Sequence, residues 1–181
     1  MKIQELLLHE VMETGFESTQ ISPSTWSIDI PQTSIKPSSK YYGTDLNVRV
    51  DVNSNQVDGY TVSEVSFGIP GTTAVELEKI FENNEVFKLL KTIIDVIETY
   101  EADIILFVPN DVKVDIGNKK ARLYKTVALR MKRLGKVGRI EEFQDSGNTF
   151  QAIFPSKSKA WKLSNDEVQN ILIQFVGNKT Q

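Results

Sequence analysis

The feature that most constrains the fold is an amphipathic helix followed closely by a short apolar run. Residues 86–100 carry apolar side chains at helical spacing, which predicts one helix with a wide apolar face. Residues 103–108 (DIILFV) are almost wholly apolar and stop at Pro109, as in a strand buried on both faces of a sheet. With a strand before the helix, these segments make a β-α-β unit, which should cross over right-handed. The chain is therefore expected to build a sheet that helices cover.

Two strands are predicted before that helix. Residues 46–52 alternate apolar and polar side chains, which is typical of a half-buried strand. A loop is expected over residues 53–59, and a second strand over residues 60–67. The apolar residues of this second strand change face midway. Either a bulge near Ser63 and Glu64 brings them to one face, or the strand is buried on both faces.

A hairpin and a capped helix are predicted towards the end of the chain. Residues 139–144 and 149–154 flank Asp-Ser-Gly-Asn, a turn sequence that favours a β-hairpin. Ser164 and Glu167 have the spacing of a capping box, in which each residue satisfies a backbone N–H of the other. The sequence therefore predicts a helix that begins after Ser164 and ends at Gly177.

These patterns predict an α+β fold with a mixed β-sheet. The sheet domain is expected to span residues 46–155, with a connector and the capped helix over residues 156–181. Residues 1–16 are expected to hold a short amphipathic helix. Residues 17–45 are rich in Ser, Thr and Pro, which favours an extended arm rather than a packed module. Within this arm, the alternation of Trp26, Ile28 and Ile30 is compatible with a short edge strand.

Composition excludes several classes of protein. The chain has no cysteine and one histidine, so it has no disulfide framework, no thiolate metal site and no multi-histidine metal site. No apolar run reaches the roughly 20 residues of a membrane span. The first residues have no positively charged lead, so we expect no secretory signal. The sequence therefore predicts no metal and no membrane association.

Basic residues are concentrated in one stretch of an acidic chain. Residues 119–139 hold nine lysines and arginines and no acid, whereas the whole chain has a net charge of −3, so the remainder carries −12. Residues 119–134 are predicted to form a helix ended by Gly135, and the helical spacing places the basic side chains opposite the apolar ones. The expected basic face comprises Lys119, Arg122, Lys125, Arg130, Lys132, Arg133 and Lys136.

Three interpretations of this basic face are open. It can be a solvated helix surface, a nucleic-acid interface, or a docking face for an acidic protein surface, including that of a second copy. Nucleic-acid binding usually needs exposed aromatic residues beside the charge. The stretch contains only Tyr124, which the helical spacing turns inwards. We therefore rank docking or solvation above nucleic-acid binding.

The order of predicted elements from residue 46 is strand, strand, helix, strand, helix, strand, strand. This order and the segment ARLYKTVALRMKRLG resemble the GNAT family of acyl-CoA-dependent N-acyltransferases. The resemblance implies acetyl-CoA or another acyl-CoA as cofactor. It also implies Glu64 as general base and Tyr124 as the acid that protonates the leaving thiolate.

The same resemblance implies that the phosphates of the cofactor lie on the loop containing Gly68, Gly71 and Thr72. The sequence departs from the family here. The glycine spacing differs from R/Q-x-x-G-x-G/A, and Pro70 lacks the N–H that would bind phosphate.

Two further resemblances concern the origin of the chain. Residues 86–135 are similar to uncharacterised small proteins of tailed phages and some bacteria. The first ten residues, MKIQELLLHE, resemble the capsid-targeting leaders of T-even-type phage internal head proteins. These resemblances imply an accessory protein located in the virion or the host cytoplasm. From its basic helix we expect this protein to act by protein docking, and we expect no cofactor. The alternatives are an N-acyltransferase and a nucleic-acid-binding protein.

Overall fold

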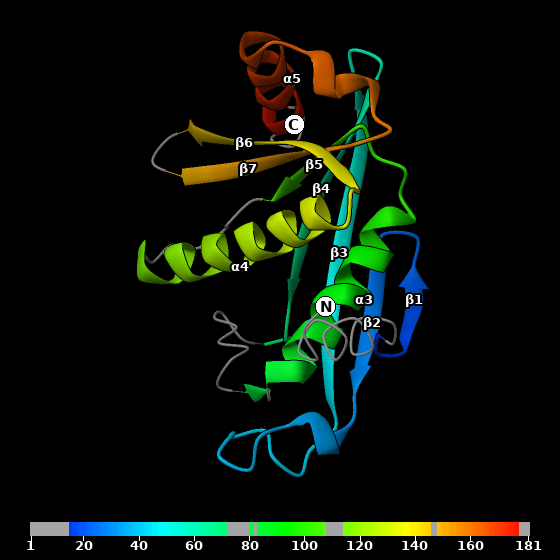
Figure 1. The fold of residues 1–181 in the computed structure, drawn as a ribbon, viewed down its shortest axis with the longest axis vertical. Helices are drawn as coiled ribbons and strands as arrows, with labels where there is room; N and C mark the ends of the chain where they lie inside the picture. Colours follow the sequence, from blue (N-terminus) through cyan, green and yellow to red (C-terminus); the bar gives the residue numbers. More distant parts are fainter. Residues whose placement is uncertain (1–14, 72–79, 82, 108–113, 146–147, 178–181) are drawn as a thin grey trace, which may run out of the picture. The chain divides into compact units, whose positions relative to one another are not determined.

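The computed structural model describes residues 15–71, 80–81, 83–107, 114–145 and 148–177 (Figure 1). Within these residues the fold is α+β, with three α-helices and one mixed seven-stranded sheet in the order β1-β2-β3-β4-β5-β7-β6. The strands are β1 Ser18–Ser22, β2 Thr25–Ile30, β3 Leu46–Val57, β4 Tyr60–Gly68, β5 Ile104–Phe107, β6 Val137–Asp145 and β7 Asn148–Pro155. The helices are α3 Asn83–Glu98, α4 Val114–Arg133 and α5 Asn165–Gly177, with short 3-10 helices η1 Gln32–Ser34 and η2 Lys159–Lys162.

The chain divides into two compact units. The first unit comprises Met1–Asp51 and Phe67–Ile97, and the second comprises Val52–Ser66 and Glu98–Gln181.

The first unit contains two strands where an extended arm was expected. The strand β2 pairs antiparallel with β3 from Thr25 opposite Asp51 to Ile30 opposite Leu46, and β1 pairs with β2 on its other side. Residues 17–30 are therefore part of the sheet, which corrects the prediction of an arm. The strand β2 is also not an edge strand, because β3 pairs with one of its edges and β1 with the other. The sequence of β1, STQIS, is polar and mostly exposed, so it lacks the apolar alternation that reveals a strand.

The helix expected at residues 86–100 is confirmed as α3 in the first unit. Its apolar face is buried, and four of its residues (Leu89, Leu90, Ile93, Ile94) have at most 1% of their surface exposed. The helix expected within residues 1–16 lies almost wholly outside the described residues.

The connection between β3 and β4 is shorter than the sequence suggested. Strand β3 continues to Val57, and the turn consists of Asp58 and Gly59, both with positive φ (49° and 80°). The predicted loop over residues 53–59 is therefore wrong. Two consecutive left-handed residues make the tight hairpin turn whose twist matches that of the strands, so the strands extend almost to the turn.

Strand β5 is the centre of the second unit. Its four residues, Ile104–Phe107, are all buried, as predicted for a strand covered on both faces. It pairs parallel with β4 from Val62 opposite Ile104 to Val65 opposite Phe107, and antiparallel with β7. The pairing with β5 runs one to one through Ser63 and Glu64, so no bulge interrupts it there.

The two faces of this part of the sheet are covered by different helices. Ile104 and Leu106 belong to a core cluster with Ala152, Phe154 and the apolar face of α5. Side chains alternate along a strand, so Ile105 and Phe107 point to the other face, where Phe107 contacts α4. Figure 1 shows α4 and α5 on opposite sides of β5, β7 and β6.

The predicted capping box is confirmed. The backbone N–H of Ser164 donates to the Glu167 carboxylate at 2.8 Å, and the backbone N–H of Glu167 donates to the Ser164 hydroxyl at 3.3 Å. The Ser164 hydroxyl also donates to this carboxylate at 2.7 Å. These hydrogen bonds lower the pKa of Glu167 below 4.5, because they stabilise the charged carboxylate.

We predict that Ser164→Ala destabilises the protein by about 1 kcal/mol through loss of the cap, measured by urea denaturation at neutral pH. Because folding lowers the pKa of Glu167, its contribution is present above the unfolded-state pKa and is lost as the pH falls through the folded-state pKa. In Ser164→Ala, NMR titration should show the pKa of Glu167 returning towards 4.5. Ser164→Thr retains the hydroxyl and should remain close to wild type. Equal losses in both variants would contradict the cap as the cause.

Candidate docking surface on helix α4

Helix α4 is longer than predicted but ends where the sequence places its end. The expected helix over residues 119–134 is observed as Val114–Arg133. At its end, the N–H of Gly135 donates to the carbonyl of Lys132, and the N–H of Lys136 donates to that of Met131. This pair of bonds forms a Schellman motif, and Gly135 has the left-handed φ of 70° that the motif requires.

The inner face of α4 packs on the sheet. Tyr124, Val127, Ala128 and Met131 are each at most 2% exposed. The ring of Tyr124 stacks on that of Phe107 with centroids 4.7 Å apart and an angle of 5° between the planes. Contacts of α4 with both β6 and β7 extend this packing along the helix.

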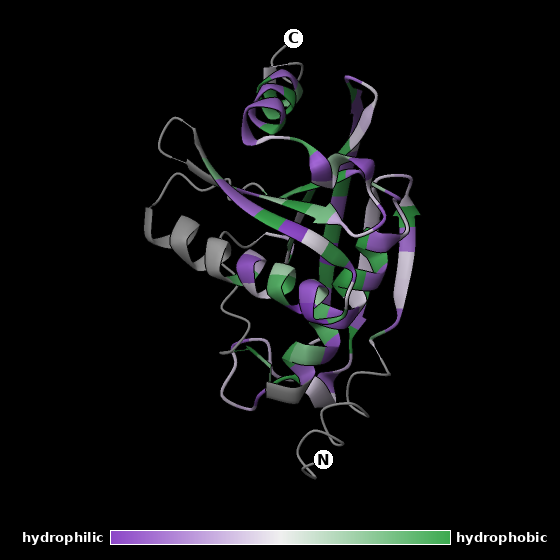
Figure 2. Ribbon diagram, turned by 45° about the horizontal axis from the view of Figure 1, so that its top comes forward, coloured by the Kyte–Doolittle hydropathy of each residue, from purple (hydrophilic) through white to green (hydrophobic). Residues whose placement is uncertain are grey.

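The outer face of α4 combines cations with an exposed leucine. Leu129 is 45% exposed, and Lys125, Lys132 and Arg133 are exposed at positions three or four residues from it. Residues at this spacing are neighbours on a helix surface. We call these four residues the α4 surface. Figure 2 shows hydrophilic and hydrophobic residues alternating around the described half of α4.

Leu129 is the member of the α4 surface that the sequence analysis missed. The sequence feature that could have identified Leu129 as exposed is its position among basic residues on the polar side of the helix. Leu134, which the helical spacing placed on the apolar side, is 39% exposed, because it lies beyond the last residue of α4.

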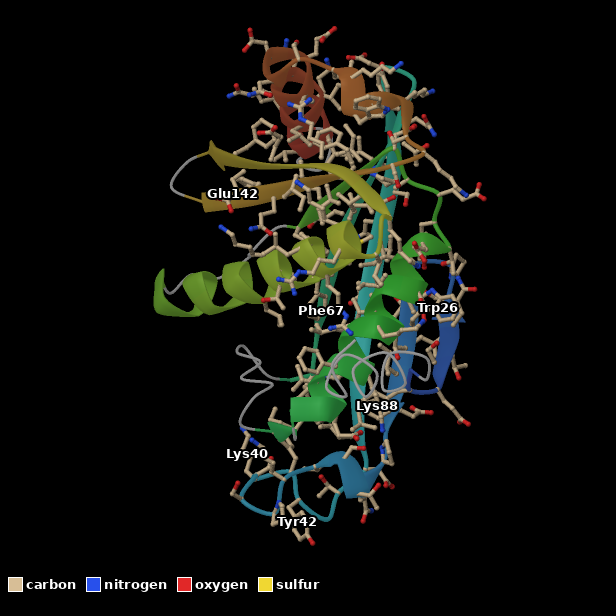
Figure 3. The ribbon with its side chains drawn as sticks, viewed as in Figure 1. Trp26, Lys40, Tyr42, Phe67, Lys88 and Glu142 are labelled. Atoms are coloured by element: carbon tan, nitrogen blue, oxygen red, sulfur yellow. The ribbon has the colours of Figure 1, made fainter. Side chains whose placement is uncertain are left out.

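Part of the basic stretch is neutralised within the second unit. Lys125 pairs with Glu142 at 3.1 Å, Lys136 with Glu98, and Arg139 with Glu141 at 2.8 Å. Figure 3 labels Glu142 on β6, from which it reaches the side of α4. Within the described part of the chain, no ion pair involves Lys132 or Arg133. Among the described side chains of this stretch, the cations without an ion pair therefore include Lys132 and Arg133, which lie beside Leu129.

Arg130 differs from its neighbours because it is half-buried. Burial, and after it the charge of Arg133, lower the pKa of the Arg130 guanidinium. Lys119 and Arg122 lie on the described backbone of α4, but their side chains are outside the described residues. Among the described side chains of the expected basic face, Lys125, Lys132 and Arg133 are exposed.

Two polar side chains of the sheet, Glu142 and Gln151, lie beside Lys125 at the edge of the α4 surface. Glu142 accepts a hydrogen bond from the buried Gln151 amide at 3.2 Å in addition to its ion pair with Lys125. The side-chain oxygen of Gln151 is also buried and has no hydrogen-bond partner among the described residues. These contacts fix the position of Glu142 and so hold Lys125 against β6.

The two expected catalytic residues lie on opposite faces of the sheet. Glu64 pairs in register with Leu106, which faces α5, whereas Tyr124 stacks on Phe107, which faces α4. Glu64 is half-buried and Tyr124 is 2% exposed. Tyr124 therefore acts as a core residue, and its place in the structure does not bring it beside Glu64 on one surface.

The expected phosphate-binding loop belongs to the first unit. Gly68 ends β4, and Gly71 is exposed with a φ of 77°. Thr72 lies outside the described residues.

The described residues contain no group of three or more metal-ligating side chains that could hold a metal ion. Their helices include none that is long and apolar enough to cross a membrane. A pocket of about 350 Å³ lies between α5 and the strands, lined by Leu106, Phe143, Phe150, Leu172, Ile173 and Val176, with Gln169 and Gly177. Among the described residues, no charged side chain lines this pocket.

Comparisons with models of protein families, with curated proteins and with solved structures find no match to this chain.

We predict that Tyr124→Ala costs about 3–5 kcal/mol of stability, because it removes a buried ring from the α4 interface. Tyr124→Phe keeps the stacked ring and should cost less than about 1.5 kcal/mol, the net value of a hydrogen bond. Urea denaturation of the three proteins measures both changes. A larger loss for Tyr124→Phe than for Tyr124→Ala would show that the ring stack is not the stabilising contact.

Proposed function

We propose that this protein is a docking module that binds an acidic macromolecular partner through the α4 surface. The observation that carries the proposal is the position of Leu129. An exposed apolar residue surrounded by Lys125, Lys132 and Arg133 can bury surface at its centre while its rim pairs with carboxylates. A merely solvated face gains nothing from an exposed leucine.

The internal ion pairs support this choice of residues. Glu142 and Glu98 hold Lys125 and Lys136 in place at the edges of the surface. Lys132 and Arg133 remain available to a partner in the described structure. A rigid surface loses less conformational entropy on binding than a mobile basic tail.

A protein partner is favoured over nucleic acid. Binding of single strands usually uses exposed aromatic side chains on which bases stack. The aromatic residue of this segment, Tyr124, is buried under the helix. The accessory role in a tailed phage, expected from the sequence, is compatible with a docking surface of this kind.

The test uses a fluorescein-labelled helical peptide rich in Glu and Leu, with fluorescence anisotropy as the readout. We predict that Lys132→Glu with Arg133→Glu weakens binding at least about tenfold, because like charges then face each other. Leu129→Ser should weaken binding with little change in its salt dependence, since it removes apolar area and no charge.

The matched control is Lys157→Glu with Lys162→Glu, an equal charge change at two exposed lysines outside α4, which should leave binding unchanged. A short DNA duplex distinguishes the alternative. Tight DNA binding that falls steeply between about 50 and about 200 mM salt would replace the protein-docking proposal with nucleic-acid binding. Absence of binding to both probes would leave the α4 surface as a solvated face and overturn the proposal.

A second candidate is an acyl-CoA-dependent N-acyltransferase on a GNAT-like scaffold. The observation that favours it is the element order β3-β4-α3-β5-α4-β6-β7, with β4 parallel to β5 and β5 antiparallel to β7. In the family that this order resembles, the cofactor enters between the two parallel strands. The residues proposed for this activity are Glu64 and Tyr124.

Isothermal titration with acetyl-CoA tests this second candidate. Enzymes of this kind bind their substrates between about 1 µM and about 1 mM. Micromolar binding that Tyr124→Phe weakens would support an acyltransferase, because this variant keeps the stacked ring and loses only the hydroxyl. No binding at about 1 mM acetyl-CoA would eliminate it.

A further inference from the structure

The first unit contains an acidic hollow that none of the proposed activities uses. It has a volume of about 640 Å³ and is lined by Gly15, Phe16, Glu17, Asp29, Ile30, Pro31, Asp45 and Asn47. Its lining includes three exposed carboxylates, Glu17, Asp29 and Asp45, and no lysine or arginine among the described residues. We call this feature the acidic hollow.

The carboxylates of the acidic hollow are held on the sheet. Asp29 lies on β2, Glu17 directly before β1, and Asp45 directly before β3. The backbone N–H of Asp29 donates to the carbonyl of Glu17 at 3.1 Å, so the two segments are adjacent. The register pairs Asp29 with Asn47 of β3, so Asp45, two residues before Asn47, lies diagonally across from Asp29.

Among the described residues, no cation pairs with these carboxylates. Asp45 accepts a hydrogen bond from the amide of Gln32 at 3.1 Å, and no ion pair in the described residues involves Glu17, Asp29 or Asp45. Three like charges in one hollow repel one another, so a cationic partner would be stabilising.

We propose that the partner of the α4 surface is the acidic hollow of a second copy of this chain. The inference rests on the proposed docking function and names its partner. Lys132 and Arg133 have no acid partner in the described structure, and Glu17 and Asp29 have no cation. Contact between two copies satisfies both sets of charges at once.

The apolar residues of the two surfaces also match. Leu129 lies at the centre of the α4 surface, and Phe16 and Pro31 lie in the lining of the acidic hollow. The charge distribution of the sequence agrees with this contact. Outside residues 119–139 the chain carries a net charge of −12, so at high protein concentration a second copy supplies an acidic surface.

The contact joins two different surfaces, the α4 surface of one copy and the acidic hollow of the other. This property permits a mixing experiment. The first variant combines Lys132→Glu and Arg133→Glu, so both of its surfaces are acidic. The second variant combines Asp29→Lys and Asp45→Lys, so both of its surfaces are basic. All four positions are exposed, and circular dichroism with thermal unfolding checks that each variant folds.

Sedimentation velocity of the full chain at about 100 µM and about 50 mM salt measures association. We expect the wild type to associate, each variant alone to associate at least about tenfold more weakly, and the equimolar mixture to recover wild-type association. The control variant Lys157→Glu with Lys162→Glu should associate like the wild type.

Three outcomes overturn the inference. A wild type that stays monomeric under these conditions has no such contact. A mixture that stays monomeric, or an acidic-hollow variant that associates like the wild type, shows that the acidic hollow is not the partner. Neither result removes the docking function, which is tested separately by the peptide. If the wild type binds the Glu/Leu peptide through Lys132 and Arg133 but does not self-associate, the docking proposal stands and the second copy is excluded as its partner.

Discussion

The structure of the second unit depends on strand β5 being buried on both faces. All four of its residues are apolar and buried, and it pairs with β4 on one side and β7 on the other. A strand of this kind needs a helix on each face of the sheet. Its even-numbered residues, Ile104 and Leu106, pack with α5, and Phe107 stacks on Tyr124 of α4. The inner face of α4 is thereby fixed, and with it the set of residues that α4 presents to solvent.

This constraint explains the character of the α4 surface. Tyr124, Val127 and Met131 are committed to the sheet, so the basic residues of the same helix face outwards. The acids that oppose them come from elsewhere in the unit and neutralise the edges of the surface, at Lys125 and Lys136. The α4 surface then retains the exposed Leu129 and two cations without an acid partner among the described residues, Lys132 and Arg133. Such an arrangement suits recognition of a shaped acidic surface better than non-specific attraction of a polyanion.

Several elements could be predicted because their signals are local. The helix α3, the strand β5, the hairpin of β6 and β7, the C-terminal end of α4 and both ends of α5 all follow from periodicity or from capping residues a few positions apart. The strands of residues 17–30 could not, because β1 is polar and becomes a strand only by pairing with β2. The Asp58–Gly59 turn was also missed, since polar residues of a long, exposed hairpin resemble a loop.

For the candidate site, the sequence by itself determined that a basic helix with one apolar side would exist, and that it would end at Gly135. Spacing along a helix and the left-handed preference of glycine are properties of short segments. Only the tertiary structure decided which of these cations remain available to a partner. Glu142 lies 17 residues from Lys125, and Glu98 lies 38 residues from Lys136, and no local pattern pairs them. Strand pairing likewise decided that Glu17, Asp29 and Asp45 line one hollow, because it brings segments far apart in the chain side by side.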